Sequence, residues 1–436
     1  MKEYFFYLVL SLIFVHLQAQ EVSFIEYNLD NGLHVILHQD NTAPVVTTSV
    51  LYHVGSKDEK EDRTGFAHFF EHLLFEGTKN IERGKWFNIV SANGGENNAY
   101  TSSDYTYYYE VFPSNNLELG LWLESERMLH PIINKIGVDT QNEVIKEEKK
   151  VGEESPYGKV LDEVKDNLFV NHPYKRTIIG ETAHLDAAKL EEFLEFNKKY
   201  YVPNNAILVV AGDIQIDATK KMIANYFGSI PKGKVIDCKK IKEKPILETL
   251  EATAYDTNIE IPMLVTAYRT PSIKNRDSKV LDMISSYLSD GKSSKLYRKM
   301  VDEKKNALEI GAFNIGQEDY SMYIIYGLPL GDISLEKITK DFDEEIIKIQ
   351  EELISEKDYQ KLQNMIETNF VNSNSSVEGI ANSLAEYYAF YKDTNLINSE
   401  IKIYRSISRE EIQQVAQKYL KPNQRLVLSY LPESTK

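Results

Sequence analysis

Hydrophobic and polar residues alternate with a period of two over residues 22–53, which predicts β-strands in this part of the chain. Turn residues at 30–32 interrupt the alternation, so we expect a β-hairpin that enters a sheet. Residues 98–112 are rich in Tyr and Thr and predict one or two further strands. The apolar run at 206–211 predicts another strand.

Other segments repeat their apolar residues with the helical period. They are residues 64–77, 81–91, 115–130, 139–153 and 187–201. Turn residues at 93–95 and 156–158 separate these helices from their neighbours. Because helices and strands alternate irregularly and include hairpins, the pattern favours an α+β fold over a doubly wound parallel sheet.

The second half of the chain repeats part of the first. The run Lys199-Tyr200-Tyr201-Val202-Pro203-Asn204 is echoed at 418–423, and an acidic amphipathic helix precedes each run while an apolar strand follows it. One repeat at half the chain length predicts two homologous domains, which suits a chain of 436 residues. We expect an N-terminal domain at 21–230, an exposed linker at 231–250 and a C-terminal domain at 251–436.

The N-terminus carries an apolar run from Tyr4 to Leu17, which follows Lys2 and ends before Ala19-Gln20. The run is too short to span a bilayer comfortably and fits a secretory signal peptide at 1–20. A single retained membrane anchor is the alternative. We therefore expect an exported protein, either periplasmic or secreted.

The charge, the cysteine count and the histidine positions exclude several functions for this protein. The chain has 50 Lys and Arg against 66 Asp and Glu, and its net charge of −16 argues against nucleic acid as a partner. Its single cysteine, Cys238, excludes an intrachain disulfide framework and a cysteine-based zinc site. All nine histidines lie in the first half, so any histidine chemistry belongs to that half.

The predicted helix at 64–77 contains the pattern H-x-x-E-H. His68 and His72 are four residues apart and share one helix face, and Glu71 lies on the same side. Two neutral imidazoles suit Zn²⁺, and a neighbouring carboxylate can polarise a metal-bound water. Chance would produce this pattern only about 0.02 times in such a chain. The alternative is a pair of surface histidines, but the apolar flanks indicate a buried helix where unpaired polar groups are costly.

A catalytic zinc site has three protein ligands and one open position. The charged segment 141–150 offers three candidates for the third ligand: Glu143, Glu147 and Glu148. Spacing alone does not choose between them, and most of this charge belongs to a solvated helix face.

At these residues the chain resembles the pitrilysin/insulinase zinc endopeptidases, which include the mitochondrial processing peptidase and insulin-degrading enzyme. The resemblance covers nearly the whole chain after residue 20. Its main runs are Gly65-x-x-His68-x-x-Glu71-His72, Asn93-Gly94-Gly95-x-x-Asn98-Ala99-x-Thr101, Val144-Ile145-Lys146-Glu147-Glu148 and Tyr201-Val202-Pro203-Asn204-Asn205. It implies two homologous domains of the LuxS and processing-peptidase type, each a mainly antiparallel sheet packed with helices. The domains face each other as half of a clamshell, and the second has no metal site.

The resemblance also implies roles for individual residues. His68 and His72 match the zinc ligands, Glu148 matches the third ligand, and Glu71 matches the general base. These residues would hold one Zn²⁺ per chain and hydrolyse peptides or unfolded proteins through a zinc-activated water. Asn98 and Ala99 match the edge strand to which substrate adds, although Asn98 taken alone also fits a turn or bulge residue.

Two departures from the family pattern matter. Gln141 stands where the family often has a second glutamate. The family's second half commonly contributes an arginine and a tyrosine, but here Lys295 stands where arginine is common and no tyrosine occurs around 308–310. Arg298 lies nearby, but its position does not match the pattern. We therefore expect a homodimer, or a heterodimer with a zinc-free paralogue that supplies the Arg/Tyr pair.

Two other functions compete with this hypothesis. One is a peptide-binding or assembly subunit of a heteromeric processing peptidase, with little activity alone. The other is a metal-dependent hydrolase of small molecules. The intact His68–Glu71–His72 set argues against the first, and the predicted edge strand favours peptides over the second.

Overall fold

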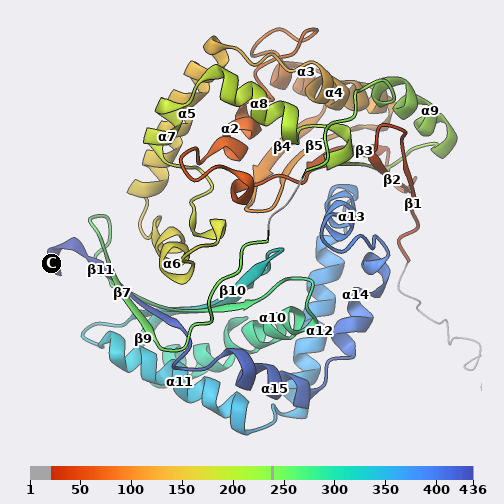
Figure 1. Cartoon of the computed structure of the whole chain (residues 1–436). Helices are drawn as coiled ribbons and strands as arrows, with labels where there is room; N and C mark the ends of the chain where they lie inside the picture. The colour runs from red at the N-terminus through yellow and green to blue at the C-terminus, as the bar shows by residue number, and fades with distance from the viewer. Residues whose placement is uncertain (1–20, 237–239, 436) are drawn as a thin grey trace, which may run out of the picture.

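The computed structural model describes residues 21–236 and 240–435, so the expected signal peptide at 1–20 and Cys238 lie outside the described residues. Two β-sheets, one from each half of the chain, form the framework, and helices pack against both (Figure 1). Among the described helices, none combines the length and the apolar character needed to span a bilayer.

The N-terminal half forms a six-stranded sheet in the order β1-β2-β6-β3-β5-β4. Its strands are β1 (Ile25–Asn28), β2 (His34–Gln39), β3 (Val45–Tyr52), β4 (Glu96–Thr101), β5 (Thr106–Pro113) and β6 (Ala206–Gly212). The expected hairpin is present, since β1 and β2 pair antiparallel with Ile25 opposite Leu37. Among the described strands, β4 lies at the edge of this sheet and pairs with β5.

The C-terminal half forms a five-stranded sheet in the order β7-β11-β8-β10-β9. Its strands are β7 (Leu250–Asp256), β8 (Met263–Pro271), β9 (Ala307–Ile315), β10 (Tyr320–Pro329) and β11 (Leu426–Pro432). This order repeats β2-β6-β3-β5-β4 of the N-terminal sheet. In each of these two five-strand series the first pair is parallel and the following pairs are antiparallel. The predicted α+β fold of two homologous halves is therefore confirmed.

Helices of the N-terminal half are α2 (Phe66–Leu73), α3 (Trp86–Ala92), α4 (Leu117–Leu129), α5 (Lys135–Glu154), α6 (Val160–Leu168), α7 (Thr182–Ala187), α8 (Leu190–Tyr200) and α9 (Ile216–Phe227). Those of the C-terminal half are α10 (Arg276–Ser289), α11 (Leu335–Glu351), α12 (Glu356–Ser373), α13 (Val377–Tyr391), α14 (Leu396–Arg405) and α15 (Arg409–Tyr419). The described residues between α9 and β7 form neither helix nor strand.

The helix expected at 64–77 ends early, at Leu73. The chain turns at Gly77, whose φ of +153° favours glycine, and a Cβ there would lie 2.9 Å from the carbonyl oxygen of Ile81. The apolar spacing continues past the helix because Phe75 packs against the same core.

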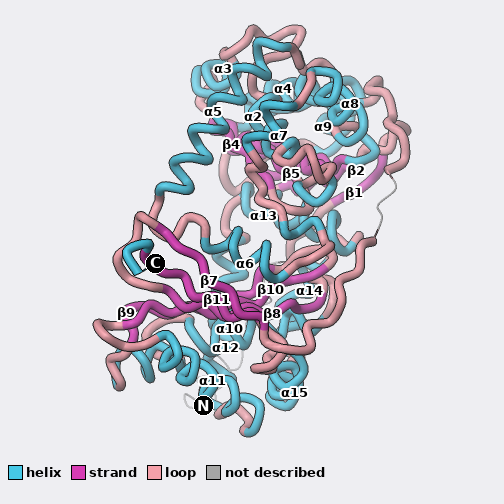
Figure 2. Tube along the Cα trace, turned by 60° about the vertical axis from the view of Figure 1, so that its left-hand side comes forward, coloured by secondary structure: helices cyan, strands magenta, loops and turns pink. Residues whose placement is uncertain are grey.

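One helix from each half packs against the sheet of the other half. α6 packs on the C-terminal sheet, where Val164 and Leu168 join the same core as Leu428. α13 packs on the N-terminal sheet, where Leu384 joins the same core as Val209. Figure 1 shows α6 in yellow against the lower sheet and α13 in blue reaching the upper one, and both lie between the two sheets in Figure 2. The two halves therefore share their cores.

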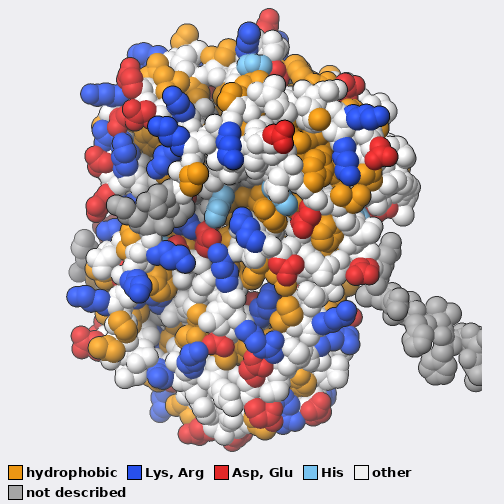
Figure 3. Space-filling model, turned by 45° about the vertical axis from the view of Figure 1, so that its right-hand side comes forward, with side chains coloured by type: hydrophobic (Ala, Val, Ile, Leu, Met, Phe, Trp, Pro, Cys, Tyr) orange, Lys and Arg blue, Asp and Glu red, His pale blue; other side chains and the backbone are white. Residues whose placement is uncertain are grey.

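Ion pairs also join the halves, at the turn between β9 and β10. Glu318 in this turn lies 2.8 Å from Nε2 of His53 and 2.6 Å from Nζ of Lys57. Lys57 also pairs with the buried Asp104 at 2.8 Å. On the face of the molecule shown in Figure 3, acidic and basic side chains are interspersed and neither kind forms one dominant patch.

The Glu318 contacts predict acid sensitivity. Burial alone would raise the pKa of Glu318. The hydrogen bond from His53 and the charge of Lys57 outweigh burial and hold this pKa far below its usual value of 4.5. A carboxylate with a lowered folded pKa stabilises the folded state above pH about 4.5, and this contribution is lost as the pH falls. We expect the unfolding free energy of the wild type to fall more steeply below pH 4.5 than that of Glu318→Gln, as measured by urea unfolding.

Glu143→Gln is the control, because this exposed carboxylate pairs with Lys146 on its own helix and not with a residue of the other half. Its stability profile should follow the wild type. Coincident pH profiles for the wild type and Glu318→Gln would contradict the prediction.

Candidate metal centre

Helix α2 is anchored at its start by a buried carboxylate. Glu59 accepts hydrogen bonds from the amides of Gly65 and Ala67, both at 2.8 Å, and so satisfies two free donors of the first helical turn. Burial raises the pKa of Glu59 to about 8, while the two amides favour its charged form. Gly65 itself has φ +90°, which favours glycine.

The end of α2 is held by two buried side chains. The hydroxyl of Tyr108 donates to the carbonyl of Phe70 at 2.9 Å, and the guanidinium of Arg127 donates to that of Leu74 at 3.2 Å. Arg127 is wholly buried and pairs with Glu110 and Glu124, which are also wholly buried. These supports join distant segments, so the local sequence patterns carried no signal for them.

His68, His72 and Glu148 come together where α2 faces α5. Nε2 of His68 lies 3.6 Å and Nε2 of His72 lies 3.3 Å from the Glu148 carboxylate, and all three ligand atoms lie within 4.8 Å of one another. Tetrahedral zinc with bonds of about 2.0–2.2 Å places its ligands about 3.3–3.6 Å apart. The two histidine–carboxylate distances match this spacing, and the donor types suit a zinc ion.

The other two candidates for the third ligand lie elsewhere. Glu143 is largely exposed and pairs with Lys146 at 3.0 Å, and Glu147 is exposed and outside the group of three. Gln141 donates to Glu76 beyond the end of α2. Of the three glutamates left open by spacing, the structure brings Glu148 to the histidines.

The charge states of the group suit metal binding. Burial, followed by the proximity of His72, lowers the pKa of His68 to about 4, so its imidazole is neutral at physiological pH. The hydrogen bond with His72 lowers the pKa of Glu148 and keeps its carboxylate charged. Neutral imidazoles and a charged carboxylate are the forms that bind zinc.

Glu71 lies beside the three ligands but is not one of them. Its Oε2 accepts a hydrogen bond from Oγ1 of Thr101 at 2.7 Å. Burial raises the pKa of Glu71, and the Thr101 hydrogen bond opposes that shift. A carboxylate with these properties can accept and return a proton.

Asn98 and Ala99 lie on the edge strand β4, which contacts α2. The amide of Ala99 donates to Oδ1 of its neighbour Asn98 at 2.9 Å. The expectation that these residues lie on a strand with a free edge agrees with the sheet order.

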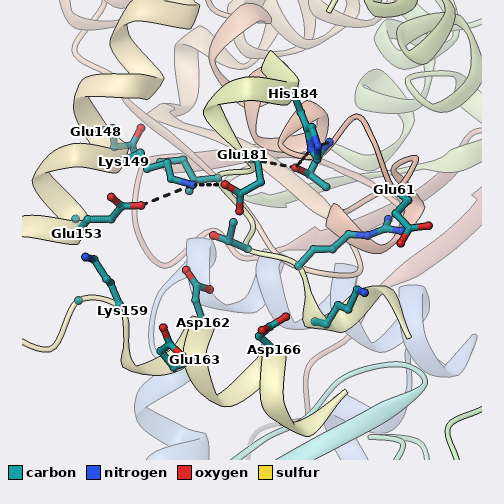
Figure 4. Close-up of a pocket in the computed structure, with 17 residues that line it drawn as sticks. Glu61, Glu148, Lys149, Glu153, Lys159, Asp162, Glu163, Asp166, Glu181 and His184 are labelled. Carbon is teal, nitrogen blue, oxygen red and sulfur yellow. Dashed lines mark hydrogen bonds and ion pairs between the residues drawn. The ribbon is translucent and has the colours of Figure 1, made fainter. Parts of the chain in front are cut away.

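Beside Glu148 opens a cavity of about 690 Å³. Figure 4 shows side chains of α5, α6 and the segment around α7 pointing into it, with Lys149 between Glu153 and Glu181. More carboxylates than basic groups line this cavity. The carboxylates are those of Glu61, Glu148, Glu153, Asp162, Glu163, Asp166 and Glu181.

The two positions where the family pattern predicts an arginine and a tyrosine lie outside the candidate metal centre. Lys295 pairs with Asp358 within the C-terminal half, at 2.8 Å, and Leu308 lies exposed on the edge strand β9. Neither is part of the His68–His72–Glu148 group.

Comparison with known proteins covers both halves. Residues 34–182 match the model of the insulinase family, peptidase family M16, and residues 187–366 match that of the peptidase M16 inactive domain. The zinc protease PqqE of Helicobacter pylori is 27% identical over 414 residues, which cover 94% of this chain and 93% of that protein. The uncharacterized zinc protease YmxG of Bacillus subtilis is 25% identical and covers 76% of this chain and 80% of its own.

Solved structures show the same fold. The crystal structure of a protease from Helicobacter pylori superposes with a TM-score of 0.89 at 27% identity, covering 94% of this chain and 99% of that one. A peptidase M16 inactive domain from Pseudomonas fluorescens reaches a TM-score of 0.85 at 14% identity, over 94% and 98% of the two chains, and supports the fold alone. The chain belongs to the pitrilysin/insulinase (M16) family of peptidases and has the two domains of that family.

Proposed function

We propose that this chain is a zinc-dependent endopeptidase that hydrolyses peptides or unfolded proteins and holds one zinc ion. The observation that carries the proposal is the convergence of His68, His72 and Glu148, with the carboxylate of Glu71 outside this group and held by Thr101. When bound there, zinc would supply Lewis-acid activation of water and of the scissile carbonyl. The relatives named zinc proteases support this choice of metal.

Glu71 would act as the general base and then as the general acid. It takes a proton from the attacking water and delivers it to the leaving amine, which requires a carboxylate that is not engaged as a ligand. Its pKa, raised by burial, favours holding the proton between these two steps.

The edge strand β4 would bind the substrate main chain. An exposed edge provides backbone hydrogen bonds to an extended peptide without demanding one sequence. Asn98 and Ala99 lie in the middle of this edge, so they would contact the peptide near the scissile bond. The acidic cavity and the net charge of −16 favour basic or unfolded peptides.

A partner and a compartment complete the proposal. The C-terminal half lacks the Arg/Tyr pair at the positions that the family pattern predicts, so a zinc-free paralogue would supply it in a heterodimer, whereas a homodimer would lack the pair in both copies. The apolar run within residues 1–20 supports export to the periplasm or the medium.

The proposal is tested by zinc analysis of the purified chain together with cleavage of an unfolded peptide, with and without a chelator. We expect about one zinc per chain and cleavage that the chelator abolishes. Zinc without cleavage would favour the alternative, a peptide-binding subunit that needs a partner. Absence of zinc, or cleavage that resists the chelator, would overturn the proposal.

A further inference from the structure

The hydroxyl of Thr101 is the polar side-chain group on β4 that reaches Glu71. Its Oγ1 lies 2.7 Å from Oε2 of Glu71, within the range of a strong charge-assisted hydrogen bond. The contact joins the predicted substrate-binding strand to the zinc-binding helix.

The strand fixes the direction of this hydroxyl. Side chains of β4 alternate between two faces: Ala99 belongs to the core that contains Phe70 of α2, whereas Tyr100 points to the other face and donates to Asn382 of α13 at 2.6 Å. Thr101 lies on the same face as Ala99 and so faces α2. Its β-branched side chain has few χ1 rotamers, so it is a rigid donor.

We propose that Thr101 is a positioning residue for Glu71, an inference that rests on the proposed function. A glutamate side chain has three rotatable bonds, and the Thr101 hydrogen bond restrains one oxygen while the other stays available for proton transfer. Misplacement of a catalytic group by about 1 Å can cost a factor of about 10² in rate. Loss of the hydroxyl should therefore lower kcat and leave substrate binding intact.

Three variants test this inference. Thr101→Val keeps the shape of the side chain and removes the donor, whereas Thr101→Ser keeps the donor. Thr106→Val is the matched control, because Thr106 lies opposite Thr101 on β5 and donates to the carbonyl of Val54 instead. We expect Thr101→Val to lower kcat by about 10- to 100-fold with KM changed less than about twofold. Thr101→Ser should recover most of the rate, and Thr106→Val should keep the wild-type kcat.

Two measurements other than activity accompany the kinetics. Zinc stoichiometry should be unchanged in all three variants, because Thr101 contacts none of the metal ligands that we identify. Crystal structures should show the Glu71 carboxylate displaced in Thr101→Val and retained in Thr101→Ser.

Several results would overturn the inference. With an active wild type, a normal kcat in Thr101→Val, equal losses in the Val and Ser variants, or loss of zinc in Thr101→Val would each exclude the positioning role and leave the proposed function standing. A wild type that shows no chelator-sensitive cleavage would instead overturn the proposed function and this inference with it.

Discussion

Glu71→Gln is expected to retain zinc and to lose peptide hydrolysis by about 10²- to 10⁴-fold, the usual contribution of general acid–base catalysis. An amide of nearly the same shape can still accept the hydrogen bond from Thr101, but it cannot take a proton from water. Zinc should remain because Glu71 is not among the three clustered ligand atoms. Steady-state kinetics and metal analysis of the same preparation provide the measurement.

The exposed Glu143→Gln is a suitable control for this variant, since it makes the same chemical change away from the site. Its kcat and zinc content should equal those of the wild type. Substantial turnover by Glu71→Gln would reject the assignment of Glu71 as the general base.

Glu148→Gln should lose the metal. The charged carboxylate is the anionic member of the ligand set, and its replacement leaves two imidazoles and a weak amide ligand. We expect a loss of zinc affinity greater than the 10- to 100-fold that removal of an outer-shell partner typically costs. Competition with a zinc-binding dye would measure it, and His68→Ala should behave in the same way.

The neighbouring residue offers a close control for the ligand test. Glu147 is exposed and lies outside the group, so Glu147→Gln should keep wild-type zinc affinity and activity. If Glu148→Gln kept its zinc, the choice of third ligand would return to Glu143 or Glu147.

The parts of the site that depend on local geometry could be predicted from the sequence. His68, Glu71 and His72 lie on one helical turn, so their spacing alone brings them to one face. Glu148 lies far along the chain, and helical spacing left three glutamates equivalent until α2 and α5 were packed together. The Thr101 hydrogen bond depends on the same tertiary contact, between β4 and α2.

In the fold, too, the elements could be predicted from local sequence patterns, whereas their packing partners could not. The alternation at 22–53 predicted the β1–β2 hairpin, and the repeated run before β6 and β11 predicted two related halves. The amphipathic pattern of a helix states which face is apolar, but not which sheet will cover it. The placement of α6 and α13 on the opposite sheets therefore required the structure.

This exchange of α6 and α13 has a consequence for biosynthesis. The N-terminal sheet emerges from the ribosome with one apolar face bare, and α13 follows only near the end of translation. Native folding must wait for contacts between residues far apart in the chain, which slows it and leaves a nascent intermediate prone to aggregation. The same interlocking favours reassembly of a chain cut between the halves, because each fragment carries a helix that the other needs.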